Sequence, residues 1–447
     1  MEEEDVTIDT NSREIVLDIL MEILEKGNLS HLVLKQALEK YQYLEKQDRA
    51  FITRITEGTL EYLIQIDAVI NRYSKVKVNK MKPVIRTIMR MSVYQLLYME
   101  RVPDSAVCNE AVKLAKKRKF QGLTGFVNGV LRNISREKDT LEFTSPAERF
   151  SIPQWMFSMW EKIYGTETAE KIAASFLEDR PLTVRCNVSM ASVDEITESL
   201  NAQGIEAEVS PISGTMLSLK GYDYLDAVQV FAEGKITVQD VSSSLVGVVA
   251  APKKGDFVLD VCSAPGGKSM HAADLMDGTG LVESRDLTEY KISLVEENIA
   301  RCGFSNMQTK VWDATVLDPS MEGKADIVLA DLPCSGLGII GKKPDIKMRL
   351  KEEELAELAA LQRQILSVVS RYVKPGGMLV YSTCTINPAE NEENAAWIEK
   401  ELPFKKKEIA SVLPEVLKKD CVENRIQLLP GIHPCDGFFI AVFEKVQ

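Results

Sequence analysis

The segment FVLDVCSAPGGKSMHAADLM, residues 257–276, has the pattern of a strand, a loop and a helix in direct succession. Its start is apolar enough for a buried strand, residues 262–268 form a loop rich in glycine and proline, and a helix is expected to begin at about Ser269. Glycines allow the backbone of such a loop to approach a ligand, and the free N–H groups of a helix N-terminus favour an anion. The segment therefore predicts a ligand-binding unit of an α/β fold.

Two common nucleotide-binding fingerprints are absent from this loop. The pattern GxGxxG does not occur, and Cys262 stands where the Walker pattern needs its first glycine. A dinucleotide dehydrogenase and a phosphate-cradling nucleotidase are therefore disfavoured. A smaller anion, such as the carboxylate of an amino-acid-like cofactor, fits the loop better.

From about residue 236 onward, strand-like and helical runs alternate, which predicts βαβ units and a mostly parallel sheet. Asp286, Asp313 and Asp331 come at the ends of three successive strands. Asp286 is placed to accept from ribose hydroxyls, and Asp313 could accept from an adenine amino group. A strand-end aspartate alone is often only a helix N-cap, but the set suits a nucleoside without phosphate. S-adenosylmethionine meets that description.

Two cysteines follow the fourth and fifth strands, Cys334 in DLPCSG and Cys384 in YSTCT. Methyltransferases that act on exocyclic amines usually carry (D/N)PP(Y/F) where DLPCSG stands. Two thiols beside a carboxylate suit a target that must be activated, such as carbon-5 of cytosine, which becomes nucleophilic when a thiolate adds to carbon-6. Asp331 is the expected acid at ring nitrogen 3. The alternative, a buried inert cysteine, is disfavoured for Cys384 and remains open for Cys334.

The N-terminal part of the chain shows helical periodicity over residues 13–134, with Ser12 as an expected N-cap. We predict a helical domain at 1–140, linker helices with a small α+β unit at 141–235, and the α/β domain at 236–447. Residues 72–119 contain thirteen Lys/Arg against three acidic residues. This excess is a candidate phosphate-binding face, and its alternative is a solvated helix surface. Three cations at its C-terminal end are expected to contact RNA: Lys116, Lys117 and Arg118.

The bulk composition narrows the class of protein further. A chain of 447 residues with 45% hydrophobic and 27% charged residues predicts two or three globular domains. No stretch is apolar enough to span a bilayer, and the acidic N-terminus lacks a signal-peptide core, so we expect a cytoplasmic protein. Eight cysteines without a CxxC pair, and only three histidines, disfavour a zinc site or a disulfide framework. The net charge of −12 argues against a uniformly basic nucleic-acid binder.

The order of several motifs resembles that of one enzyme family over nearly the whole chain. VLDVCSAPGGKS, RDLTEYK, LADLPCSGLG, YSTCT and DGFFIAVFEK follow one another as in the Sun/Fmu (RsmB) branch of the NOP/Sun RNA cytosine-5 methyltransferases. DRAFITRITEGTL and FVNGVLRNI resemble the NusB-like RNA-binding domain of that branch, and the middle unit is similar to its RRM-like extension. The resemblance implies a Rossmann-like class I methyltransferase domain at the C-terminus.

The resemblance also implies roles for individual residues. Cys384 would be the nucleophile, and Cys334 the thiol that assists release of the methylated base. Lys342, Lys343 and Lys347 would face RNA. The residues expected to hold S-adenosylmethionine are Cys262, Ser263, Ala264, Pro265, Gly266, Gly267, Lys268, Asp286, Asp313 and Asp331.

The implied substrate is 16S (small-subunit) ribosomal RNA with a single-stranded or flipped-out cytosine. We expect the protein to be a monomer that binds no metal ion and does not associate with a membrane. One alternative is a tRNA cytosine-5 methyltransferase with the same catalytic core. The other is a non-catalytic RNA-binding assembly factor, which the intact pair of cysteines disfavours.

Overall fold

The computed structural model describes residues 11–446 and divides the chain into two compact units. The helical unit consists of residues 1–178 together with residues 340–350. The two-sheet unit consists of residues 179–339 together with residues 351–447. The chain therefore leaves the second unit once, for eleven residues, to complete the first.

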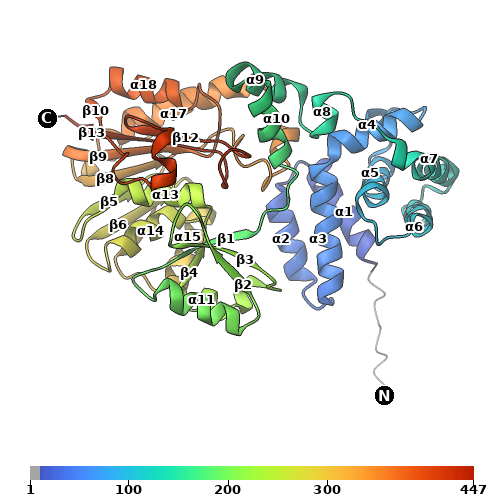
Figure 1. Ribbon diagram of the computed structural model, residues 1–447, viewed down its shortest axis with the longest axis horizontal. Coiled ribbons are helices and arrows are strands. Elements are labelled where there is room, and N and C mark those ends of the chain that lie inside the picture. Colours follow the sequence, from blue (N-terminus) through green and yellow to red (C-terminus); the bar gives the residue numbers. More distant parts are fainter. Residues whose placement is uncertain (1–10, 447) are drawn as a thin grey trace. The chain divides into compact units, whose positions relative to one another are not determined.

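Helices α1 to α7 of the helical unit, whose bounds follow, are drawn in Figure 1 and bury one apolar face each in the common core of this unit. Its helices are α1 (Ser12–Leu24), α2 (Ser30–Lys40), α3 (Lys46–Glu61), α4 (Leu63–Tyr73), α5 (Pro83–Tyr98), α6 (Asp104–Lys117), α7 (Thr124–Glu137), α8 (Pro146–Arg149), α9 (Gln154–Tyr164), α10 (Thr166–Ser175) and α16 (Ile346–Arg349). The predicted helical N-terminal domain is confirmed. The unit continues past residue 140, because α8, α9 and α10 also belong to it.

Helix α1 illustrates how the periodicity produces the core. Ile15, Ile19 and Ile23 recur every four residues and are all buried. The expected N-cap was wrong by one residue. Asn11 caps the helix through its side-chain oxygen, which accepts from the backbone N–H of Arg13 at 2.9 Å. Ser12 is the first helical residue instead.

The two-sheet unit begins with a small antiparallel sheet of order β2-β3-β1-β4. Its elements are β1 (Leu182–Cys186), α11 (Val193–Ala202), β2 (Glu206–Val209), β3 (Met216–Lys220), α12 (Gln229–Ala232) and β4 (Ile236–Val238). Ser192 and Glu195 form a capping box at the start of α11, and Ile196 and Leu200 bury its inner face. β4 pairs with β1, so this α+β sheet continues beyond residue 235.

The second sheet has nine strands and is mostly parallel in its centre. The order is β11-β12-β13-β9-β8-β5-β6-β7, with β10 paired to β13. Strands β9, β8, β5, β6 and β7 run parallel, and the C-terminal strands are antiparallel additions. The strands are β5 (Phe257–Asp260), β6 (Leu281–Asp286), β7 (Met307–Val311), β8 (Ala325–Asp331), β9 (Val373–Thr383), β10 (Phe404–Lys406), β11 (Cys421–Val422), β12 (Arg425–Leu428) and β13 (Phe438–Lys445).

Helices cover both faces of this sheet, as Figure 1 shows. The covering helices are α13 (Val241–Ala250), α14 (Gly267–Leu275), α15 (Glu289–Cys302), α17 (Glu354–Val369) and α18 (Glu392–Glu401). Neighbouring strand residues divide between two cores: Val258 packs with α13 and α14, whereas Leu259 packs with α17 and α18. The predicted mostly parallel α/β domain is confirmed.

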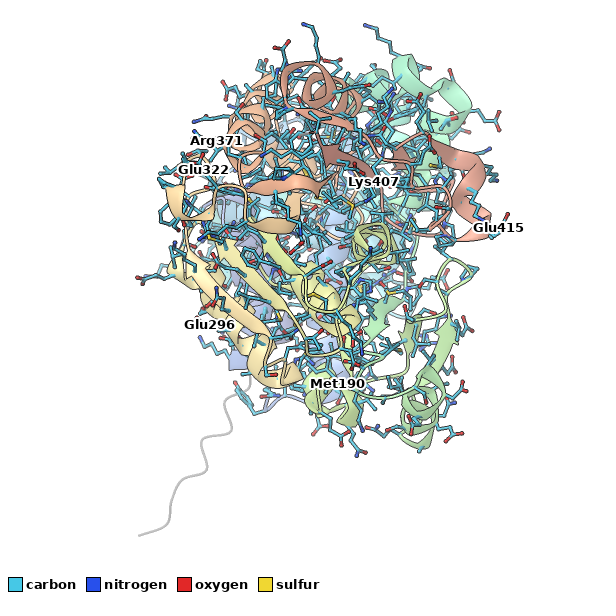
Figure 2. All side chains as sticks on the ribbon, turned by 90° about the vertical axis from the view of Figure 1, so that its left-hand side faces the viewer. Met190, Glu296, Glu322, Arg371, Lys407 and Glu415 are labelled. Atoms are coloured by element: carbon cyan, nitrogen blue, oxygen red, sulfur yellow. The ribbon has the colours of Figure 1, made fainter. Side chains whose placement is uncertain are left out.

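Polar contacts join the loops at the other ends of the strands. Arg371 and Glu322 lie next to each other in Figure 2, and Nε of Arg371 donates to Oε1 of Glu322 at 2.6 Å. Glu322 precedes β8 and Arg371 precedes β9, so the pair links the two strand starts. None of the helices within residues 11–446 has the length and apolarity that crossing a membrane requires.

Candidate active site

The carboxyl ends of the parallel strands bring the predicted site residues to one edge of the sheet. β5 ends at Asp260, β6 at Asp286 and β8 at Asp331, and Cys384 follows the last residue of β9. β5 lies between β8 and β6, so the chain order reverses beside it. Such a reversal opens a crevice at the carboxyl ends of the strands, where open α/β sheets bind ligands.

The glycine loop is held in shape by backbone contacts with β6. The N–H of Ser263 donates to the carbonyl of Arg285 at 2.8 Å, and the N–H of Ala264 donates to Oδ2 of Asp286 at 3.0 Å. Gly266 has a φ of +102°, a left-handed conformation that favours glycine, and it directly precedes α14. The loop and the helix N-terminus therefore meet as the sequence predicted.

The predicted cofactor aspartates differ in their surroundings. Asp286 is buried, and besides Ala264 it accepts from Nζ of Lys291 at 3.0 Å. Asp313 is exposed and lies two residues beyond β7, where its Oδ1 accepts from the backbone N–H of Thr315 at 2.8 Å. Asp286 thus helps to shape the loop, while Asp313 uses one oxygen to hold its own turn.

Asp331 forms an ion pair with the lysine of the glycine loop. Its Oδ2 lies 2.7 Å from Nζ of Lys268, and its Oδ1 accepts from Oγ of Ser382 at 2.8 Å. Burial is the largest single influence on the pKa of Lys268 and lowers it, but the carboxylate of Asp331, together with Asp260 and Cys384, raises that pKa above its usual value. A thiolate at Cys384 is among the weaker causes that raise the same pKa, so this ammonium and the sulfur lie within electrostatic reach.

Two buried polar atoms beside the loop have no hydrogen-bond partner in the described residues, Oδ1 of Asp260 and Oγ of Ser263. Burial raises the pKa of Asp260 to about 7, although Ser269 donates to its other oxygen at 2.6 Å. Unpaired buried polar atoms cost free energy unless a ligand or water satisfies them. These atoms, with the carboxylates at the strand ends, fit the amino-acid and ribose groups of S-adenosylmethionine.

The two cysteines of the site lie side by side. The Sγ atoms of Cys334 and Cys384 are 3.2 Å apart, and both side chains are partly exposed. The contact with Cys384, and burial after it, raise the pKa of Cys334 well above that of a free thiol. Either sulfur can be the donor in this contact, and the raised pKa of Cys334 favours an S–H of Cys334 that points toward the sulfur of Cys384.

A buried carboxylate, Glu390, joins the two cysteine loops, and sequence reasoning missed it. Its oxygens accept from the N–H of Ser335 at 2.9 Å, from Oγ of Ser335 at 2.5 Å and from Nε2 of Gln362 at 2.9 Å. Oγ of Ser335 also lies 2.7 Å from Oγ1 of Thr385. Ser335 follows Cys334 and Thr385 follows Cys384, so this carboxylate fixes the residues next to both sulfurs.

A second set of contacts holds the turn after Cys384. Asn391 accepts from Oγ1 of Thr383 at 2.5 Å and donates to the carbonyl of Thr385 at 3.0 Å. The N–H of Gly338 donates to the carbonyl of Cys384 at 3.1 Å. The signal in the sequence was the polar run NPAENEEN behind Cys384, but neither periodicity nor spacing shows which of its carboxylates turns inward.

The lysines of residues 340–350 that were predicted to contact RNA differ in their exposure to solvent. Lys342 and Lys343 are exposed. Lys347, which we expected to face RNA, is only 5% exposed, and its Nζ donates to the carbonyl of Ser151 at 2.9 Å and to that of Glu61. Burial lowers the pKa of Lys347 to about 7. Its ammonium ties residues 340–350 into the helical unit, which corrects the expected surface position.

The basic residues at the end of α6 also separate into two groups. Nζ of Lys117 lies 2.5 Å from a carboxylate oxygen of Glu14, and Arg118 lies 2.6 Å from Asp18. Lys116 is exposed and forms no ion pair within residues 11–446. The charges of Lys117 and Arg118 are thus largely compensated within the unit, and that of Lys116 is not.

A mostly parallel sheet with a glycine loop after β5 and carboxylates at the strand ends is the arrangement of a Rossmann-like methyltransferase. The comparisons with known proteins agree. The 16S rRNA methyltransferase RsmB/F family matches residues 247–444, the NusB family matches residues 10–136, and a ferredoxin-like domain of RsmF/B-like methyltransferases matches residues 152–222.

Whole-length relatives extend these matches. A probable ribosomal RNA small subunit methyltransferase B of Bacillus subtilis is 37% identical, covering 98% of this chain and 99% of the relative. The ribosomal RNA small subunit methyltransferase B of Salmonella newport is 31% identical over 97% of the chain and 99% of that protein. The crystal structure of PH0851 superposes with a TM-score of 0.83 at 28% identity, covering 98% of this chain and 100% of the other. The chain belongs to the RsmB family of 16S rRNA methyltransferases.

Proposed function

We propose that this protein methylates carbon-5 of a cytosine in 16S ribosomal RNA through a covalent bond between Cys384 and carbon-6 of the base. The observation that carries the proposal is the 3.2 Å contact of two thiols at the carboxyl edge of the sheet. The names of its whole-length relatives support small-subunit ribosomal RNA as the substrate, rather than tRNA. The intact cysteines and glycine loop support an enzyme over a non-catalytic assembly factor.

Cys384 is the proposed nucleophile because two neighbouring groups can stabilise a negative charge on its sulfur. Cys334 can donate its S–H to the Cys384 sulfur, and the Lys268 ammonium lies within electrostatic reach. The thiolate adds to carbon-6 while ring nitrogen 3 takes a proton from the ion pair of Lys268 and Asp331, in which the Lys268 ammonium holds the proton and Asp331 relays it. This addition leaves an electron-rich carbon-5. When bound, S-adenosylmethionine supplies the electrophilic methyl group.

Cys334 is proposed to act after the methyl group is in place. Its pKa is raised first of all by the contact with Cys384. Once the Cys384 sulfur is bonded to carbon it no longer carries negative charge, so Cys334 becomes easier to deprotonate. Loss of the carbon-5 proton to a base then breaks the bond between carbon-6 and the sulfur. We propose that Cys334 assists this release.

The loop Cys262–Lys268 and the strand-end aspartates are the proposed cofactor site, and the helical unit is the proposed RNA-holding part. The test is transfer of labelled methyl from S-adenosylmethionine to 16S rRNA and, in parallel, to bulk tRNA. We expect incorporation at one cytosine of 16S rRNA, located by bisulfite sequencing. Incorporation into tRNA alone, or no incorporation into either RNA, would refute the proposal.

A further inference from the structure

The two cysteines of the candidate site, Cys334 and Cys384, lie close enough to react with each other. Their sulfurs are 3.2 Å apart. A disulfide bond is about 2.05 Å long, so an approach of about 1 Å would join them. Both side chains are partly exposed, and a small reagent can therefore reach them. Cys421 is also partly exposed, but its sulfur contacts an oxygen instead, the carbonyl of Glu423 at 3.6 Å.

Hydrogen bonds hold the two cysteine loops next to each other. Where the loops leave β8 and β9, the N–H of Leu332 donates to the carbonyl of Ser382 at 3.1 Å. Farther along, Glu390 accepts from the N–H of Ser335, and Oγ of Ser335 lies 2.7 Å from Oγ1 of Thr385. The residues that follow the two cysteines are thus tied to each other, which gives each sulfur a high effective concentration at the other.

The surroundings of Cys384 favour its thiolate, which is the form of cysteine that attacks an oxidant. The Lys268 ammonium lies within electrostatic reach of the Cys384 sulfur, and an S–H of Cys334 can point toward it. An accessible thiolate next to a second cysteine is the arrangement of a redox-sensing pair, in which one sulfur is oxidised and the other resolves it into a disulfide.

We propose that Cys334 and Cys384 form a reversible disulfide when a hydroperoxide reacts with them, and that this disulfide switches methylation off. The Cys384 thiolate attacks an oxygen of the hydroperoxide. A sulfur–oxygen bond forms, the oxygen–oxygen bond breaks, and water or an alcohol leaves once it takes a proton from solvent. The Cys334 sulfur then attacks the Cys384 sulfur and expels hydroxide, which leaves as water with the proton of Cys334. The pair of thiols loses two electrons, and the hydroperoxide gains them.

The disulfide removes the proposed nucleophile, because the Cys384 sulfur then has no negative charge with which to add to carbon-6. It also protects this sulfur from further oxidation to sulfinic acid, which dithiols do not reverse. A dithiol reductant restores both thiols by exchange. The oxidation is independent of the proposed function, whereas the loss of methylation rests on it.

The first test exposes the reduced full-length protein to hydrogen peroxide and counts its free thiols after denaturation. We expect two of the eight free cysteines to disappear, and a peptide map to show one cross-link, between Cys334 and Cys384. The matched control is Cys421→Ser, which removes a partly exposed cysteine outside the pair and should form the same cross-link. A protein that keeps all its thiols, or that cross-links another pair, would overturn the inference.

Dimedone, a reagent that traps sulfenic acids, tests the order of the two steps. In Cys334→Ala the sulfenic acid of Cys384 has no resolving thiol, so its labelling should exceed that of wild type by about tenfold or more. Cys384→Ser should show no labelling at Cys334. Equal labelling of Cys384 in wild type and in Cys334→Ala would show that Cys334 does not resolve the oxidised sulfur.

Methyl transfer to 16S rRNA is measured before oxidation, after oxidation and after dithiothreitol. We expect activity to fall in proportion to the cross-linked fraction and to return to within about twofold of its starting value. Full activity of the cross-linked protein would rule out the switch. If the cross-link forms and reverses but the reduced protein does not methylate 16S rRNA, the proposed function fails while the disulfide stands. If the reduced protein methylates but peroxide never joins the two thiols, only this inference fails.

Discussion

Cys334 and Cys384 lie 50 residues apart in the chain, yet their sulfur atoms are 3.2 Å from each other. The sheet explains this meeting, because β8 and β9 are parallel neighbours with Asp331 opposite Ser382. The loops that leave the two strands therefore start side by side. The contact raises the pKa of the Cys334 thiol.

Cys384→Ser should lower the rate of methyl transfer to 16S rRNA by about 10³-fold or more, because a serine hydroxyl does not ionise near neutral pH. S-adenosylmethionine should still bind within about twofold of wild type, since the change removes little volume and Cys384 is not among the residues proposed to hold the cofactor. Methyl transfer and calorimetric titration of the cofactor measure the two effects. Measurable turnover by this variant would rule out Cys384 as the nucleophile.

Glu390→Gln should separate the two cysteine loops without touching either sulfur. The amide replaces one accepting oxygen by a donor that faces the donors of Ser335 or Gln362. We expect a loss of about 1–3 kcal/mol in the free energy of unfolding, together with a tenfold or greater fall in kcat at unchanged cofactor affinity. Glu393→Gln, on the exposed surface of α18, is the matched control. Equal kcat values for the two variants would argue against a positioning role.

Asp331→Asn should lower methyl transfer by about 10²- to 10⁴-fold if Asp331 is the acid at ring nitrogen 3. The change also removes the carboxylate that raises the pKa of Lys268. Asp326→Asn at the opposite end of β8 is the control, and it should leave kcat/KM within about threefold of wild type. A similar small effect for both variants would exclude Asp331 as a catalytic acid.

Lys347→Met should remove a pH dependence from the stability of the protein. Burial lowers the pKa of Lys347 to about 7, whereas an unfolded lysine has a pKa of about 10.4. Between these values the unfolded chain binds more protons, so the free energy of unfolding of wild type should rise with pH, by at most about 1.4 kcal/mol per pH unit.

Denaturant unfolding at pH 7 and pH 9 checks this expectation. The rise should be absent in Lys347→Met and present in Lys343→Met, which changes an exposed lysine of the same segment. An identical pH dependence in all three proteins would show that the Lys347 ammonium titrates like an exposed group.

The fold could be predicted well because its signals are local. Hydrophobic periods of two and 3.6 residues marked the strands and helices, and the segment at 257–276 placed β5, the glycine loop and α14. The predicted meeting of Cys334 and Cys384 followed from the same logic, since parallel strands end at one edge of a sheet. The small sheet was recognised as α+β, but its last strand, β4, lies beyond the boundary predicted at residue 235.

The parts that could not be predicted depend on long-range contacts. Glu390 resembles its neighbours in a run of carboxylates, and only the folded chain turns it toward Ser335. Lys347 belongs to a basic loop, yet it is buried against carbonyl groups of Glu61 and Ser151, which lie 286 and 196 residues away. Charge in a sequence indicates which residues can bind an anion, not which of them already have a partner.

The decisive measurement is a denaturing gel of Cys334→Ala after incubation with S-adenosylmethionine and 16S rRNA. If the Cys384 sulfur bonds to the base and Cys334 assists its release, this variant accumulates a protein–RNA adduct, seen as a slowly migrating band. The double variant Cys334→Ala/Cys384→Ser should give no such band. An adduct that persists without Cys384, or normal turnover by Cys334→Ala with no adduct, would contradict the mechanism.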